Sequence, residues 1–205
     1  ILLAFTILYP LYYVLASSFK SRVEYAQSQV APPRKPVLYN FVKVFGAPNF
    51  LRWFENTILL TLGAVLVSLA SGCLAAYALS RMRFAGRRLM HNAIISLMVV
   101  PPIVMMIPLF VLFSRLNLVN TYSAVIVIYT GILLPFCIYL LRSFFITLPQ
   151  AMLDSARVDG CGNFAILARI ILPLSKPVLF ALLVVCALWV WNELLIALVF
   201  LQKEK

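Results

Sequence analysis

Apolar positions along the chain fall into five long runs, separated by shorter polar or basic segments. Each run is close to the length that a helix needs to cross a ~30 Å hydrocarbon core at ~1.5 Å per residue. The five predicted spans are Ile1–Phe19, Asn56–Ser80, Met90–Phe113, Tyr122–Leu141 and Val178–Leu201. The pattern therefore predicts an all-α, polytopic bundle of transmembrane helices.

Composition supports the same class, because 64% of the residues are hydrophobic and only 11% are charged. The formal charge of +11 lies in the gaps between the runs, as the flanking charges of membrane helices do, which argues against nucleic-acid binding. Four arginines within 81–88 predict a cytoplasmic loop. Two spans separate 81–88 from 142–176, so the segment 142–176 is expected on the cytoplasmic side as well.

Two features inside the predicted spans have more than one interpretation. Small residues recur every fourth position from Ala64 to Ser80, which favours close helix packing, although such a stripe can also line a path. Pro101, Pro102 and Pro108 predict kinks in the third span, either as part of a pathway or simply to shape the helix.

The polar segment Leu148–Pro177 interrupts the apolar pattern before the last span. Helical spacing lies on each side of an Asp159-Gly160 turn signal, so we expect a short helix, a glycine turn and a second short helix outside the lipid. Such a unit at a membrane surface suits docking to a partner. Catalysis is not expected, since the chain has one histidine, no phosphate-binding glycine loop and no metal-like cysteine spacing. No metal or cofactor is expected either.

The stretch Asp154-Ser155-Ala156-Arg157-Val158-Asp159-Gly160-Cys161, followed by Ile171-Leu172-Pro173, resembles the EAA loop of ABC-importer permeases. The family's pattern is E-A-A-x-x-D-G-A and then I-x-L-P. This chain has Asp154 for Glu, Ser155 for the first Ala and Cys161 for the last Ala. The resemblance implies that 148–172 is a coupling loop docked on a cytoplasmic ATPase. Its implied contact residues are Asp154, Ser155, Ala156, Asp159, Gly160, Cys161 and Phe164.

Near the end of the chain, Trp189-Val190-Trp191-Asn192-Glu193-Leu194-Leu195 resembles the W-x-W-N-(D/E)-x-L stretch of carbohydrate-uptake permeases of this binding-protein-dependent family. Aromatic rings with an amide and a carboxylate suit polyol ligands. Trp191, Asn192 and Glu193 are therefore candidates for the substrate path. The alternative is an aromatic belt at the outer interface, with Glu193 holding a neighbouring helix.

The resemblance implies a permease subunit of a bacterial importer in the inner membrane, for a sugar or related polyol. It also implies that the proline-bearing loop 20–55 lies on the extracytoplasmic side. Its implied partners are a second permease subunit forming a heterodimer, two copies of an ABC ATPase and an extracytoplasmic solute-binding protein. Two alternatives remain: the same architecture with another cargo (glycerol phosphate, a polyamine or a peptide), and a secondary carrier that needs no ATPase. Because Ile1 already lies in an apolar run, we expect 1–205 to be a fragment of one permease domain, with a sixth helix beyond Lys205.

Overall fold

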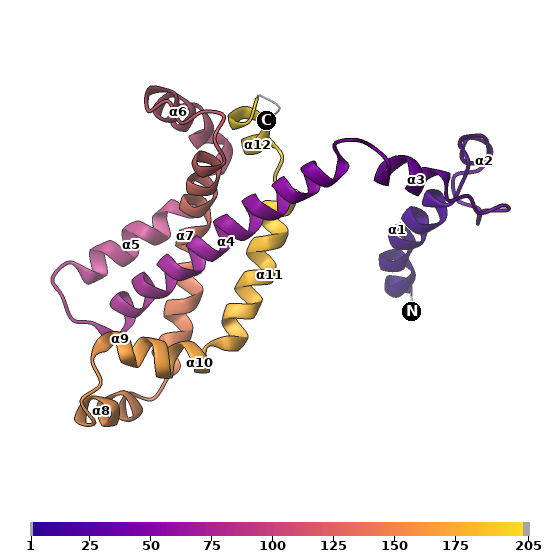
Figure 1. Cartoon of the computed structure of the whole chain (residues 1–205). Helices are drawn as coiled ribbons and strands as arrows, with labels where there is room; N and C mark the ends of the chain where they lie inside the picture. The colour runs from indigo at the N-terminus through magenta and orange to yellow at the C-terminus, as the bar shows by residue number, and fades with distance from the viewer. Residues whose placement is uncertain (1, 203–205) are drawn as a thin grey trace. The chain divides into compact units, whose positions relative to one another are not determined.

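The computed structural model describes residues 2–202, and all regular secondary structure among them is helical (Figure 1). The chain divides into two compact units, one ending at Asn56 and the other beginning at Thr57. The division falls inside α4 (Phe50–Arg81), whose last seven turns or so belong to the second unit.

The first unit contains α1 (Leu2–Ser18), α2 (Arg22–Gln27) and α3 (Tyr39–Phe45). Lys20, only 2% exposed, organises the loop between them. Its ammonium donates to the carbonyl oxygens of Ser28 at 2.9 Å and Gln29 at 3.1 Å. Asn40 closes the same loop by donating to the carbonyls of Ser18 and Lys20.

The second unit is built around α7 (Tyr122–Thr147), which packs against α5, α11 and α12. The helices of this unit that follow α4 are α5 (Arg87–Leu97), α6 (Pro102–Arg115), α7, α8 (Gln150–Val158), α9 (Asn163–Ile166), a π-helical turn (Leu167–Ile171), α10 (Leu172–Leu174), α11 (Lys176–Asn192) and α12 (Leu195–Phe200). The hydrophobic core lies between α4, α7 and α11, where Val65, Tyr129 and Leu182 are among the fully buried side chains.

By length and hydropathy, α4 and α7 are each able to cross a membrane. Two bent pairs pass the same test as broken spans: α5 with α6, and Asn163–Leu174 with α11. A shorter apolar helix covers Phe5–Ser18. These segments correspond to the five predicted runs, and the predicted all-α, polytopic class is confirmed.

The predicted third span is not one kinked helix. It breaks into α5 and α6, which meet at an angle of 101°. Pro101 and Pro102 lie at the break and start α6, because proline lacks the N–H for a preceding turn but fits the first turn of a helix. The helix continues through Pro108, so that proline does not break it.

The predicted fifth span is also wrong as a continuous helix. It stops at Asn192, and α12 begins at Leu195. Glu193 is extended, with φ −81° and ψ 119°, and its carboxylate accepts the N–H groups of Leu195 and Ile196. An acidic side chain at a helix N-terminus satisfies donors that would otherwise be unpaired, so Glu193 starts a new helix.

The small-residue stripe of α4 is a packing surface, as its spacing favours. Ala64, Ser68 and Ala76 are completely buried, and Gly72 faces α7. A Cβ on Gly72 would lie 3.0 Å from the Cβ of Cys137. The two helices can therefore approach closely only because this position has no side chain.

We expect Gly72→Val to destabilise the protein by about 1–3 kcal/mol, because the added methyl groups overpack the contact between α4 and α7. Gly131→Val is the matched control, since a Cβ there meets nothing within 4 Å. The thermal unfolding midpoint of each purified variant in detergent measures the difference. Equal midpoints for the two variants would contradict a tight α4–α7 contact.

Candidate functional site

Helix α8 presents one buried and one exposed face. Leu153 is fully buried and Ala156 is 8% exposed, so both side chains pack inward. Asp154, Ser155 and Arg157 lie on the exposed face. Of the residues that the EAA resemblance implies, Ala156 thus belongs to the packed face, while Asp154 and Ser155 are available to a partner.

The glycine turn after α8 has the hydrogen bonds of a Schellman motif. The N–H of Cys161 donates to the carbonyl of Ala156 at 2.9 Å, and the N–H of Gly160 donates to that of Arg157 at 3.0 Å. Gly160 has φ +83°, a left-handed conformation that costs other residues energy. Asp159 is the exposed C-cap, and Cys161 is a half-buried free thiol.

Two large apolar side chains flank this turn and face outward. Val158 is 87% exposed and Phe164 is 75% exposed. Farther along, Ile166 and Ile171 are fully buried, so the second helix of the loop packs against the core at these positions. Its first turn, which carries Phe164, is exposed. Exposed apolar side chains beside charged ones are typical of a surface that a partner covers.

Arg81, the last residue of α4, holds the start of this loop. Its guanidinium donates to the carbonyls of Phe145 and Leu148, the latter at 2.6 Å, and to the side-chain oxygen of Gln150 at 2.9 Å. These acceptors are the end of α7 and the start of α8. One side chain therefore ties both helices to α4 through charge-assisted hydrogen bonds.

Tyr77, one turn earlier on α4, holds the other end of the loop. Its hydroxyl lies 3.1 Å from the side-chain oxygen of Asn163, the first residue of α9. The loop between Leu148 and Asn163 is thus fastened at both ends to the last two turns of α4. We call Tyr77 and Arg81 the α4 clamp.

A short polar chain continues from the clamp across α8. Gln150 accepts from Arg81 and donates to Asp154 at 2.9 Å. Asp154 also pairs with Arg157 at 2.7 Å, the one ion pair made among residues 2–202. The pair is exposed and contributes about 0–1 kcal/mol at most, so it orients side chains more than it stabilises the helix.

The second candidate group lies at the far end of α11. Besides capping α12, the carboxylate of Glu193 accepts a hydrogen bond of 2.9 Å from the hydroxyl of Tyr129 on α7. Tyr129 is 1% exposed and packs edge-on against Trp189. Glu193 therefore joins α7, α11 and α12, which agrees with the interpretation that it holds a neighbouring helix.

Trp191 and Asn192 are both exposed at the end of α11. Asn192 donates to the carbonyl of Leu188 at 2.7 Å and leaves its side-chain oxygen toward the surroundings. The two candidate groups are separated by α11, whose 17 residues span roughly 24 Å. The structure thus brings the residues of each group together but keeps the groups at opposite ends of the unit (Figure 1).

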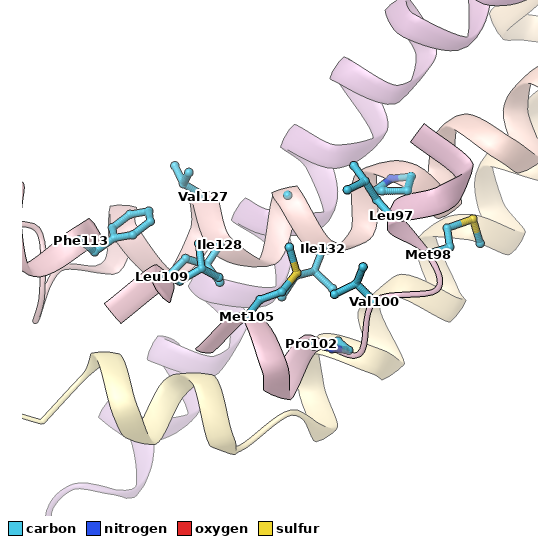
Figure 2. A pocket seen from close by; sticks show the side chains of 12 residues that line it. Leu97, Met98, Val100, Pro102, Met105, Leu109, Phe113, Val127, Ile128 and Ile132 are labelled. Carbon is cyan, nitrogen blue, oxygen red and sulfur yellow. The ribbon is translucent and has the colours of Figure 1, made fainter. Parts of the chain in front are cut away.

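A cavity of about 350 Å³ lies under the bend between α5 and α6 (Figure 2). Met105 and Leu109 on α6 face Ile128 and Ile132 on α7 across it. None of its lining side chains is polar, so no side chain in this cavity offers a hydrogen bond to a sugar hydroxyl. A smaller cavity, of about 280 Å³, adjoins it at Ile132 and reaches Trp189 on α11.

The sequence did not reveal the α4 clamp or the Tyr129 partner of Glu193. One signal was present: Arg81 stands at the end of a predicted helix, where basic residues bind terminal carbonyl groups. Its acceptors are 64 and 67 residues away, and no local pattern indicates that separation. Tyr77 carries no sequence signal beyond lying one turn before Arg81.

Comparison with known proteins connects these features to transport. The family of binding-protein-dependent transport system inner membrane components matches residues 68–204. The arabinooligosaccharides transport system permease protein AraQ of Halalkalibacterium halodurans is 32% identical over 98% of this chain and 73% of its own length. The alpha-glucoside transport system permease protein AglG of Rhizobium meliloti is 38% identical over 83% of this chain but only 46% of its own length.

A solved structure is similar over nearly the whole chain. It belongs to a bacterial ABC transporter involved in the import of the acidic polysaccharide alginate. The TM-score is 0.89 at 29% identity, over 98% of this chain and 71% of that chain. The matched region includes α8, the glycine turn and the helix that follows it.

Arg81→Gln should release the start of the loop, because glutamine cannot donate to two carbonyls and Gln150 together. We expect the thiol of Cys161 to react with a maleimide roughly tenfold faster. The other three cysteines are buried, so labelling reports this position. Arg83→Gln removes the same charge from the same segment and should leave the rate unchanged. Equal rates in both variants would show that the clamp does not hold the loop.

Proposed function

The chain belongs to the family of inner membrane components of binding-protein-dependent transport systems, and from this membership we propose that it serves as a permease subunit of a sugar-importing bacterial ABC transporter. The family makes it a multi-pass transport component of the inner membrane rather than an enzyme. The observation that carries the proposal is the exposed helix–glycine–helix loop, which is fastened to α4 at both ends and resembles the family's EAA pattern.

We infer that the loop of residues 148–172 docks on a cytoplasmic ATPase through Asp154, Ser155, Asp159, Gly160, Cys161 and Phe164. All of these residues except the half-buried Cys161 are exposed, and the outward Phe164 ring and the nearby Arg157 also support this surface. Ala156 supports the same surface from behind, by packing α8 against the core. The loop would lie on the cytoplasmic side together with 81–88, and the loop 20–55 on the other side.

The expected assembly has this chain beside a second permease subunit, with two ATPase subunits below and a solute-binding protein outside. Closure of the ATPases would push on α8. The hydrogen bonds of the α4 clamp would transmit this movement directly to α4. The backbone connections of the loop would transmit it to α7 and α11. Such a lever would move the pathway between two states that ATP and cargo bias differently.

The cargo we propose is a neutral sugar or oligosaccharide. Relatives are named for arabinooligosaccharides, alpha-glucosides, and melibiose, raffinose and stachyose. In the spans that the structure describes, Lys and Arg lie near the ends, which favours an uncharged cargo. Trp191 and Asn192 are exposed where a polyol would pass, and Glu193 would position them through its bonds to α12 and Tyr129.

Two other functions have less support. The alginate importer shows that an acidic polysaccharide is carried by a similar transporter, so a charged sugar is the main alternative cargo. A secondary carrier working without an ATPase disagrees with the family, whose members belong to binding-protein-dependent systems. Glu193, the residue that a carrier would use for ion coupling, is engaged by three backbone contacts and Tyr129.

Crosslinking from Cys161, and from Asn163→Cys, tests the partner in native membranes. We expect a crosslink to a soluble nucleotide-binding protein, and its yield should change with ATP. In the same complexes, Gly160→Val should lower the cargo transported per ATP hydrolysed about fivefold or more, because valine resists the left-handed turn. Gly162→Val is the control, since Gly162 has φ −72° and open space around its Cβ position.

Two results would count against this scheme. If neither thiol crosslinks although both react with a soluble reagent, the loop does not dock on an ATPase. If the crosslink forms but Gly160→Val transports normally, the ATPase partner stands and the turn is not part of the coupling.

The substrate path is tested with the purified transporter and its binding protein. Trp191→Ala should raise the sugar concentration needed for half-maximal stimulation of ATP hydrolysis roughly two- to tenfold, since an aromatic stacking partner is lost. Alpha-glucosides and arabino-oligosaccharides are the first probes. Leu188→Ala, another exposed position on α11, should leave this concentration unchanged. An unchanged value in both variants would remove Trp191 from the path.

A further inference from the structure

A third cavity, of about 610 Å³, lies between the loop that follows α4, the start of α5 and the last turns of α7. Its lining is basic: it includes Arg87, Arg88, His91 and Arg142. Phe84 and Leu89 supply apolar walls, and no lining residue is acidic. Nothing in the transport scheme above uses this cavity.

The end of α4 builds the cavity by attracting arginines to its carbonyl groups. The carbonyl oxygen of Leu79 accepts from the Nε atoms of Arg87, at 2.7 Å, and of Arg142, at 3.3 Å. Arg87 also donates to the carbonyls of Ser80 and Met82, so each of its three guanidinium nitrogens bonds to the end of α4 or to the residue after it. These bonds bring the cationic ends of α5 and α7 together around one opening.

Several donors in the cavity remain without a protein partner. The guanidinium of Arg88 makes no hydrogen bond to any residue that the structure describes. The same is true of the two Nη atoms of Arg142. The cavity therefore offers donors from two separate helices, which is the arrangement that binds the oxygens of a phosphate.

The chain does not supply a counter-charge for these arginines. No Asp or Glu occurs between Glu55 and Asp154 in the sequence. Asp154 is already paired with Arg157. No acidic residue of 56–153 can therefore neutralise these arginines, which leaves them available to an anion from outside the chain.

We propose that this cavity binds the phosphate headgroup of an anionic phospholipid. The loop that carries Phe84 joins two spans, which places it at headgroup depth. Phe84 and Leu89 are 40% and 75% exposed, so apolar side chains that a lipid can contact lie beside the basic groups of the cavity. Basic pockets between membrane helices on the cytoplasmic side bind anionic headgroups in this way.

The size of the cavity also favours a lipid over a free phosphate ion. It has room for roughly twenty water molecules, which is far more than one phosphate fills. The apolar walls would be left wet around a lone ion, whereas a glycerol backbone and the first methylenes would cover them. The site depends on neither the cargo nor the ATPase partner.

Photocrosslinking in native membranes, with the complete transporter, tests the proposal. Phe84→benzoylphenylalanine places a photoreactive ring in the cavity wall. Phe180→benzoylphenylalanine, at an exposed position on α11, is the matched control for lipid contact in general. Mass spectrometry then identifies the captured lipid. At each position we measure the ratio of phosphatidylglycerol adducts to zwitterionic phospholipid adducts. This ratio should be about fivefold or more higher at Phe84 than at Phe180.

In the Phe84 background, Arg88→Gln should lower this enrichment about fivefold, and Arg142→Gln should do the same by a change on a different helix. Arg83→Gln, which removes the same charge outside the cavity, should preserve it. Three results would overturn the proposal: equal lipid composition at Phe84 and Phe180, enrichment that survives both cavity variants, or capture of a protein in place of a lipid at Phe84. Loss of the enrichment in millimolar inorganic phosphate at constant ionic strength would assign the site to free phosphate instead.

Discussion

Helix ends at a membrane surface leave carbonyl groups without donors, and in this chain arginines satisfy them. Arg87 and Arg142 bind the terminal carbonyls of α4, and Arg81 binds those of α7. Because a guanidinium has five donors in a fixed plane, each of these side chains can serve two helices at once. The position of the docking loop and the shape of the basic cavity both follow from this one requirement.

The same unit combines rigid and interrupted elements. The helices α4 and α7 are continuous and pack along the small-residue stripe, so they form the fixed part. Around them, α5–α6 and α10–α11 are bent by 101° and 76°, and α11 gives way to α12 at Glu193. Prolines stand at the starts of α6 and α11, where they cannot continue the preceding helix, and at the third break the carboxylate of Glu193 accepts the N–H groups at the start of α12. A transport subunit needs this combination, since hinges move segments only against a part that stays in place.

Sequence reasoning succeeded where the signal was local. Apolar run lengths predicted the segments, the spacing of Ala64 to Ser80 predicted the packing of α4, and Asp159-Gly160 predicted the turn that Gly160 makes. It failed where a contact joins distant positions. Nothing near Glu193 in the sequence showed that Tyr129 would donate to it from 64 residues away, and the run of apolar residues concealed the break that its carboxylate caps. Ala156 illustrates a third case, because the motif gave its identity but only packing showed that it faces inward.

The arginine contacts of the α4 end also imply an order of assembly during synthesis. Arg87 finds its acceptor only eight residues upstream, so it can cap α4 as soon as the two helices have emerged from the ribosome. Arg81 has no acceptor until α7 and the start of α8 exist, at least 64 residues later. Until then its guanidinium stays hydrated at the surface, where it contributes to orienting the nascent chain. One loop of arginines thus acts first as a topological signal and later as structural caps.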